Sequence, residues 1–557
     1  MRRLSVGVLQ EEFRDLGKIV LEAPTHRKLL AEFLGTYLLV FTVGCNVLSA
    51  KRDDTEGVYA VISIGSVLMV SIYALGPISG ANFNPAVTTA VCGAGKLSIA
   101  MAVYYILTQC AAGIIGALSF WALYGQGIPF GPNEGSLFSW YQVLLAEFLY
   151  TFMLCFVVLS TACCKEPNQF FGMAIGFVIM AAGNAAGWVS GGAFNPAVGL
   201  GLDVSDSRNS GFGFCLPYIV TQCFAGTIAG IAFQFIRARE ILAEGVELPE
   251  WHDTMSKLMA EFIGTFFIVM TVGLNVVQGP AFVSNNPINE TAVFSIASAV
   301  MVMVYAMGGV SGGHLNPAVT FAIYISGRGK ISLKMSLLYM LSQTLAGLTG
   351  SLAYVFISGG ITFGLGPYSG FSWLGVFAAE FVFTFLLTFT VLCVATLRPN
   401  AGSHTKDTFG LAIGFSVIAG GYAVSAISGA AFNPAVAVAI DVSRGILVGG
   451  FWHCVPYVVF EMLGSVAAAL IFRNLFPDEF PSTAAEREEL IEEGRAQDIE
   501  MQESEEAPAP VVEMSEIRQE AKEEEKKVEK KEADAKKKDE KAKKKEEEEA
   551  KKEADAK

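Results

Sequence analysis

The chain has 557 residues, of which 52% are hydrophobic, and its mean hydropathy is +0.47. These values exclude an ordinary soluble protein of this size and indicate a membrane protein. The formal net charge is −14, but 29 acidic and 18 basic residues lie from Pro477 to the end, so most of this charge belongs to a tail. The balance is acidic, and we expect no nucleic-acid partner.

Residues 1–27 are expected to form a cytosolic N-terminal segment. They are charged and lack the apolar core of a cleavable signal peptide. Apolar residues between Leu9 and Val20 recur on one helical face, which favours a short helix on the membrane surface. The alternative is a loose lead-in to the first span.

Twelve runs of about 20 apolar residues follow, and each is long enough to cross the hydrocarbon core of a bilayer as a helix. They lie near residues 29–50, 57–76, 98–124, 139–163, 170–188, 213–236, 256–278, 289–308, 332–357, 373–396, 408–426 and 449–473. The ten cysteines stand mostly within these runs without metal-ligand spacing or a paired pattern. We therefore expect buried apolar thiols and no cofactor or metal.

The chain consists of two homologous halves. Residues 60–90 align with residues 292–322 without a gap, at a constant offset of 232. This repeat predicts a first membrane unit at 28–240, a linker at 241–254 and a second unit at 255–475.

Each half repeats again. The tripeptide Ala-Glu-Phe occurs in the first and fourth spans of each half, with its glutamate at Glu32, Glu147, Glu261 and Glu380. Each repeat therefore holds three spans, so successive repeats have opposite orientations in the membrane. Such inverted repeats are common in transporters and channels, which have their site near the midplane.

The tripeptide Asn-Pro-Ala occurs once in each repeat. The four copies are Asn84-Pro85-Ala86, Asn195-Pro196-Ala197, Asn316-Pro317-Ala318 and Asn433-Pro434-Ala435. The segments that begin there, such as 84–93 and 433–441, hold about ten residues and are too short to span, so we expect half-helices that enter the membrane and return. Asn is a strong N-cap, and Pro suits the first helical position.

The predicted half-helices have a chemical consequence at the midplane. If each asparagine oxygen caps its own helix, the amide N–H groups of two opposed asparagines point into a shared path. A water oxygen can accept from both, which orients the molecule and interrupts a proton wire, while the positive helix ends oppose cations. The motif predicts a path for neutral molecules.

The four Ala-Glu-Phe glutamates are expected to accept hydrogen bonds from the irregular backbone before each half-helix. A carboxylate inside a span is costly and usually faces the bundle interior. The alternative is a proton-coupling carboxylate of an active transporter. Glu461 stands where the other repeats have Gln109, Gln222 and Gln343, and we expect a protonated, hydrogen-bonded substitute there.

The positive charges predict that both termini are cytosolic. Lys and Arg precede the first span, flank the join between the halves and occupy the loops of that side, whereas the opposite side holds Lys51, Arg52, Arg208 and Arg444. Asn289 begins a glycosylation sequon on the external or lumenal side, and the sequence leaves its use open. The membrane is either the plasma membrane or an intracellular vacuolar membrane.

Residues 476–557 form a charged cytosolic tail. Ala, Glu and Lys dominate from Gln519 onward, and i,i+4 pairs such as Glu523 and Lys527 favour a solvated single helix. With almost no apolar face, the tail cannot form a packed domain. We expect a disordered or single-helix segment that is either a spacer or a docking site for a cytosolic partner.

The inverted three-span repeats, the Ala-Glu-Phe motifs and the pattern Ser-Gly-x-x-x-Asn-Pro-Ala make the chain resemble the aquaporin or major intrinsic protein family. The resemblance covers residues from about 28 to 475, twice over. It implies an all-α membrane protein with two six-span bundles, each a complete pore with two re-entrant half-helices. It also implies passive flow of water or small neutral solutes, no enzymatic activity, and four pores per assembly, which a homodimer would supply.

The resemblance assigns further residues to the pores. Asn84 with Asn195, and Asn316 with Asn433, would be the midplane pairs. The outer constrictions would consist of Ile64, Gly183, Gly192 and Val198 in the first pore and of Ile296, Gly421, Ala430 and Val436 in the second. The family usually has an arginine at the two valine positions, and its water-selective members tend to add an aromatic residue and a histidine. This ring has none of them.

A small apolar ring predicts a relaxed pore. It is wider than one closed by an aromatic ring and a guanidinium, and it lacks a fixed positive charge. We expect uncharged solutes larger than water to pass, such as glycerol, urea, ammonia or peroxide. A water-dominant pore, a secondary transporter and a non-conducting structural protein are the alternatives. His314, which aligns with Asn82, is expected to make a loop hydrogen bond.

Overall fold

The computed structural model describes residues 23–52, 59–132, 137–242, 248–278, 291–368, 370–397 and 405–480. The surface helix expected before residue 23, the sequon asparagine Asn289 and the tail beyond Phe480 lie outside these residues. The described part of the chain up to Phe480 belongs to one compact unit.

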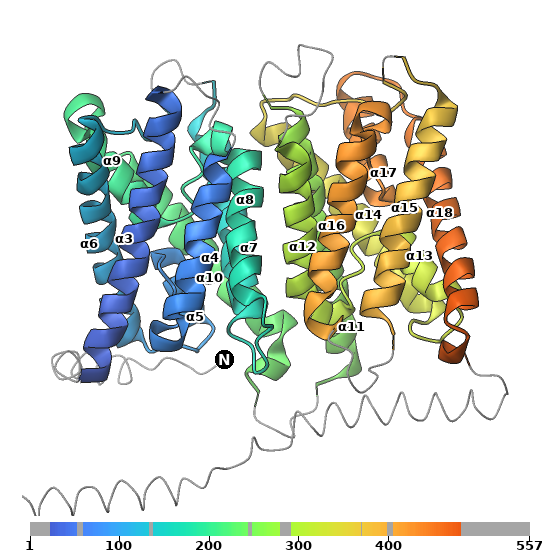
Figure 1. Cartoon of the computed structure of the whole chain (residues 1–557), viewed down its shortest axis with the longest axis horizontal. Helices are drawn as coiled ribbons and strands as arrows, with labels where there is room; N and C mark the ends of the chain where they lie inside the picture. The colour runs from blue at the N-terminus through green and yellow to red at the C-terminus, as the bar shows by residue number, and fades with distance from the viewer. Residues whose placement is uncertain are drawn as a thin grey trace, which may run out of the picture. The chain divides into compact units, whose positions relative to one another are not determined.

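Twelve helices within the described residues are long and apolar enough to cross a membrane, which confirms the predicted all-α membrane class. They are α3 (Ala23–Arg52), α4 (Ala60–Ser79), α6 (Ile99–Tyr124), α7 (Trp140–Thr161), α8 (Phe171–Ser190), α10 (Cys215–Ile236), α11 (Glu250–Val276), α12 (Ala292–Ser311), α14 (Leu333–Ile357), α15 (Trp373–Ala395), α16 (Thr405–Ser428) and α18 (Cys454–Leu475). Two bundles of six such helices, α3 to α10 and α11 to α18, make up the fold (Figure 1).

Four shorter helices begin at the prolines of the Asn-Pro-Ala motifs. They are α5 (Pro85–Gly93), α9 (Pro196–Ser210), α13 (Pro317–Ile325) and α17 (Pro434–Leu447). The expected end of the last one at Asp441 was wrong, because the helix continues until the Gly449-Gly450 pair stops it. Its final turn leaves the bundle interior, as the exposed side chains of Ile446 and Val448 indicate.

Glycines let the half-helices lie directly on the crossing spans. A Cβ atom added at Gly113 of α6 would lie 2.4 Å from the carbonyl oxygen of Ala197, and one at Gly226 of α10 would lie 2.3 Å from that of Ala86. Since real Cβ atoms do not approach so closely, only glycine permits this packing. Small residues at helix contacts are the usual device for tight association in membranes.

The two halves pack on each other through α7 and α8 on one side and α11 and α12 on the other (Figure 1). The Ser295 hydroxyl on α12 donates to the carbonyl oxygen of Ala181 on α8 at 2.8 Å. The hydroxyls of Tyr150 and Thr271 lie 3.0 Å apart, between α7 and α11. Hydrogen bonds made by hydroxyl groups therefore join the two halves within an otherwise apolar interface.

Candidate functional site

Each Asn-Pro-Ala asparagine caps its own half-helix. The Oδ1 atom of Asn84 accepts from the backbone N–H of Ala86 at 2.8 Å, and Asn84 itself is extended, with φ −155°. The other three asparagines make the same bond at 2.8 to 3.0 Å. The proline at the first helical position lacks an N–H that would need a partner there. The capping geometry expected from the sequence is thus present at all four motifs.

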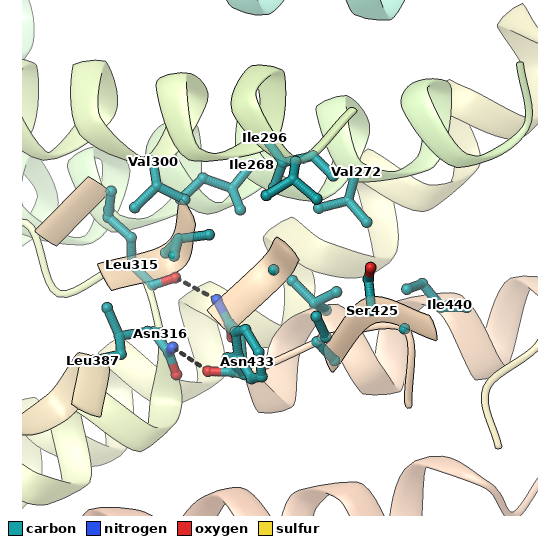
Figure 2. A pocket seen from close by; sticks show the side chains of 18 of the residues that line it. Ile268, Val272, Ile296, Val300, Leu315, Asn316, Leu387, Ser425, Asn433 and Ile440 are labelled. Atoms are coloured by element: carbon teal, nitrogen blue, oxygen red, sulfur yellow. Dashed lines mark hydrogen bonds between the residues drawn. The ribbon is translucent and has the colours of Figure 1, made fainter. Parts of the chain in front are cut away.

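The asparagine amides also bond across the midplane, which the sequence reasoning missed. In the first half, the Asn84 amide donates to the carbonyl oxygen of Phe194 at 2.9 Å, and the Asn195 amide donates to that of Phe83 at 2.9 Å. Figure 2 shows the equivalent pair in the second half, Asn316 with Phe432 and Asn433 with Leu315. An amide carries two N–H groups, so one on each asparagine remains for the path.

The residue before each motif asparagine has a left-handed backbone. The φ angles are +50° at Phe83, +46° at Phe194, +51° at Leu315 and +50° at Phe432, and none of these residues is glycine. Such a conformation costs of order 1 kcal/mol or more and persists only where neighbouring groups hold it. It aims the carbonyl of each residue at the opposite asparagine.

Buried glutamates hold these strained loops. Glu32 accepts from the backbone N–H groups of Asn82 at 3.0 Å and Phe83 at 2.8 Å, and also from Ser79 and Gln109. Glu147, Glu261 and Glu380 accept from the corresponding pairs of backbone N–H groups at 2.6 to 3.1 Å. All four are fully buried, and none lines either cavity described below. Their contacts are those expected of a loop support.

The fourth repeat departs from this pattern. In the other three, a glutamine amide donates to the glutamate, for example Gln222 to Glu147 at 2.7 Å. Here Glu461 takes the place of the glutamine, and its Oε1 atom accepts from the backbone N–H of Asn433 at 3.0 Å. Its Oε2 atom is buried without a hydrogen-bond partner among the described residues.

Each half contains a cavity at the place where its two half-helices begin. The first half has a cavity of about 200 Å³, and the second has one of about 70 Å³. The midplane pairs lie at them, and so do all eight residues assigned to the constrictions: Ile64, Gly183, Gly192 and Val198 at the first, and Ile296, Gly421, Ala430 and Val436 at the second. Apart from the asparagines and loop carbonyls, the walls are mostly aliphatic, as Figure 2 shows for the second half.

His314 also lines the second cavity. Its Nδ1 atom lies 3.1 Å from the hydroxyl of Thr320, as the Asn82 amide lies 3.2 Å from that of Thr88 in the first half. The ring thus makes the loop hydrogen bond expected for it.

Three residues that line the second cavity were not predicted from the sequence. They come from the loop before α15 and are Phe363, Leu365 and Tyr368. The available signal was a difference between the halves, because Gly366-Pro367 matches Gly131-Pro132 at an offset of 235, which aligns Tyr368 with Asn133.

Comparison with known proteins connects this geometry to one family. The model of the family described as Major intrinsic protein matches residues 20–212, 139–272, 247–424 and 371–502. Aquaporin NIP1-1 of Oryza sativa subsp. japonica is 31% identical over 257 residues, which cover 44% of this chain and 89% of that protein. Glycerol uptake facilitator protein-like 6 of Lactiplantibacillus plantarum is 36% identical over 185 residues, or 31% of this chain and 82% of that protein.

A solved structure also matches. The X-ray structure of the aquaglyceroporin from Plasmodium falciparum has 19% sequence identity and a TM-score of 0.34, and the match covers 39% of this chain and 98% of that one.

Proposed function

Because the chain belongs to the major intrinsic protein family, we propose that each of its halves is a separate passive pore for water and small uncharged solutes. The family consists of membrane channels, so the chain is a multi-pass channel protein and not an enzyme. The observation that carries the two-pore proposal is the cavity in each half, at which the two asparagine amides of that half meet.

A relaxed selectivity follows from the ring of small apolar residues. Val198 and Val436 stand where the family usually has an arginine, and Gly183 and Gly421 contribute no side chain. Such a ring supports passage of glycerol, urea, ammonia or peroxide besides water, because neither a bulky group nor a charge closes it. The similarity to a protein named as a glycerol uptake facilitator favours the same conclusion over a water-dominant pore.

Passive flow is favoured over ion-coupled transport. No Asp, Glu, Lys or Arg is among the described residues that line the two cavities, and the histidine at the second cavity, His314, is hydrogen-bonded to Thr320 and has Asn82 in its place at the first. The four buried glutamates bond to loop backbone, and none of the four lines either cavity. A secondary transporter would need a charged or protonatable group that changes access between the two sides.

Stopped-flow swelling of proteoliposomes tests this function. Wild type is compared with Val198→Arg, Val436→Arg and the double variant, using water, glycerol and urea. We expect each arginine to lower glycerol and urea flux while water flux persists, and the double variant to lose most solute flux. Unchanged solute flux would overturn the relaxed-ring argument, and flux that requires an ion gradient would indicate a transporter. An inert wild type would favour a structural protein.

The open faces of the two halves support a second copy of this chain as partner. α3 and α4 are the first-half equivalents of α11 and α12, and α15 and α16 are the second-half equivalents of α7 and α8. Val70 on α4 is 55% exposed, whereas its equivalent at the junction, Val302, is 0% exposed. Tyr73 and Tyr305 differ in the same way, at 40% and 5%.

We propose a homodimer that repeats the internal junction. Under a twofold axis, α15 and α16 of one copy would meet α3 and α4 of the other, as α7 and α8 meet α11 and α12 within the chain. Both open faces would then be covered, and the dimer would hold four pores.

The orientation is part of the same proposal. The distribution of Lys and Arg supports cytosolic termini in a plasma or vacuolar membrane. The tail would then be available to a cytosolic partner.

A further inference from the structure

The two cavities differ most at the end where the loop before α15 approaches. At the offset of 238 that relates Asn195 to Asn433, Ser425 of the second half aligns with Gly187 of the first. Both of these residues line their cavities, so a hydroxyl is present on one wall of the second cavity where the first has only backbone.

Tyr368 brings a second hydroxyl to the same end of the second cavity. Its backbone N–H donates to the carbonyl oxygen of Ile427 at 3.1 Å, which anchors the loop to the last turn of α16. Its phenol oxygen would lie 3.2 Å from a Cβ atom added at Gly429, so the ring sits over the backbone that leads to Ala430.

Neither hydroxyl is bonded within the described part of the chain. The side-chain oxygens of Tyr368 and Ser425 form no hydrogen bond to another described residue, although the bundle satisfies many of its other hydroxyls. Figure 2 shows the Ser425 oxygen pointing across the cavity toward Val272. Burial raises the pKa of Tyr368 to about 12, so the phenol stays a neutral donor at physiological pH. Free hydroxyls facing an apolar cavity are available to a passing solute.

We propose that Tyr368 and Ser425 form a solute site at one end of the second pore, which selects small polyols by size and hydrogen bonding and makes the two pores unequal. This inference rests on the proposed function, since it requires that both halves conduct.

The chemistry favours a polyol of about three carbons. Each hydroxyl can donate and accept, so two of them replace hydration at two positions of a solute that carries hydroxyls on neighbouring carbons. The phenol ring also takes up space at this end of the second cavity, which limits the size of a solute there. Longer solutes would then cross through the first pore.

The test isolates each pore with a matched pair of blocking variants. Val198→Trp fills the first cavity and Val436→Trp fills the second, because both valines line their cavities. Water, glycerol and erythritol fluxes are measured in proteoliposomes for each. We expect the ratio of erythritol to glycerol flux to be about fivefold or more lower through the second pore alone.

Variants of the two hydroxyl residues are then added in the Val198→Trp protein. Tyr368→Gly, which removes the phenol ring, and Ser425→Gly, which copies Gly187, should each raise the erythritol ratio. Tyr368→Phe keeps the ring, so it should lower glycerol flux relative to water and still exclude erythritol. Phe371→Gly, which removes an exposed aromatic from the same loop, should change nothing.

The outcomes separate this site from the proposed function. If the unblocked protein and both blocked proteins fail to conduct, the channel proposal itself fails. If both conduct with the same solute ratio, or if Tyr368→Gly leaves the ratio unchanged, the polyol site is wrong. Tyr368→Gly in the unblocked protein gives the same comparison independently of how the tryptophan variants fold.

Discussion

Glu461 accepts a hydrogen bond from the backbone N–H of Asn433 at 3.0 Å through its Oε1 atom, while its Oε2 atom has no partner among the described residues. In the other three repeats a glutamine occupies this place and donates to the loop-supporting glutamate at 2.7 to 2.8 Å. A glutamine at 461 could keep the Asn433 bond and supply the missing donor to Glu380.

We therefore expect Glu461→Gln to stabilise the protein by about 1–2 kcal/mol, since a buried oxygen without a partner is replaced by a bonded amide. Thermal unfolding in detergent measures this, with swelling assays as a check that the second pore still conducts. The matched control is Gln222→Glu, which introduces the same carboxyl pair in the first half and should lower the unfolding temperature. A destabilised Glu461→Gln protein would show that the carboxyl has a use of its own.

Removing a loop-supporting glutamate should disable one pore. Glu147→Ala leaves the backbone N–H groups of Ala193 and Phe194 buried without an acceptor, at a cost of about 1–3 kcal/mol each. The carbonyl of Phe194 would then no longer be aimed at Asn84. With the second pore closed by Val436→Trp, we expect water and glycerol flux to fall to the background of empty vesicles.

The control for this loss is Glu166→Ala, which removes an exposed carboxylate from the loop between α7 and α8. Exposed substitutions of this kind usually change stability little, so flux should be retained. Normal flux in Glu147→Ala would mean that the loop holds its shape through its asparagine bonds alone.

Much of the fold was accessible from the sequence because its signals are local and repeated. Apolar runs fix the spans, and an asparagine followed by proline fixes where each half-helix begins. The cross bonds, such as Asn84 to Phe194, were not accessible, because they depend on a left-handed residue and on how two distant loops approach. Tyr368 was also not predicted as a cavity residue, because its loop has no periodic pattern.

The histidine of the second pore should be exchangeable with asparagine. His314 and Asn82 each bond to the threonine six residues on, and both line a cavity. We expect His314→Asn to keep water and glycerol flux within about twofold of wild type, because the hydrogen bond to Thr320 is retained. His314→Leu, which removes it, should lower flux through the second pore. A large loss in His314→Asn would show that the imidazole itself contributes to conduction.

The glycine contacts beneath the half-helices should tolerate no side chain. A methyl group at Gly226 would lie 2.3 Å from the carbonyl oxygen of Ala86 and must push α5 away from α10. We expect Gly226→Ala to destabilise the first half by about 1–3 kcal/mol and to reduce its flux. Gly93→Ala, where a Cβ atom meets nothing within 4 Å, is the matched control and should behave as wild type. Equal behaviour of the two variants would contradict the packing argument.

The homodimer predicts which positions of two chains come together. Ser295 donates to the carbonyl oxygen of Ala181 inside the chain, and both residues are fully buried. Their equivalents on the open faces are Ser63, at the offset of 232, and Ala419, at the offset of 238, and both are exposed. Ser63 accepts from Asn46 at 3.0 Å, as Ser295 accepts from Asn275, but its own hydroxyl proton has no acceptor among the described residues.

Cysteines at Ser63 and Ala419, in a chain whose ten native cysteines are replaced, should therefore join two chains through a disulfide on mild oxidation. We expect a covalent dimer on denaturing gels in native membranes, because the junction inside the chain would be repeated between copies. Cysteines at Ser295 and Ala181 are the matched control. They should cross-link within one chain, which then still runs at the mass of a monomer. Monomers alone from the first pair, with efficient internal linking in the second, would rule out a dimer built on these faces.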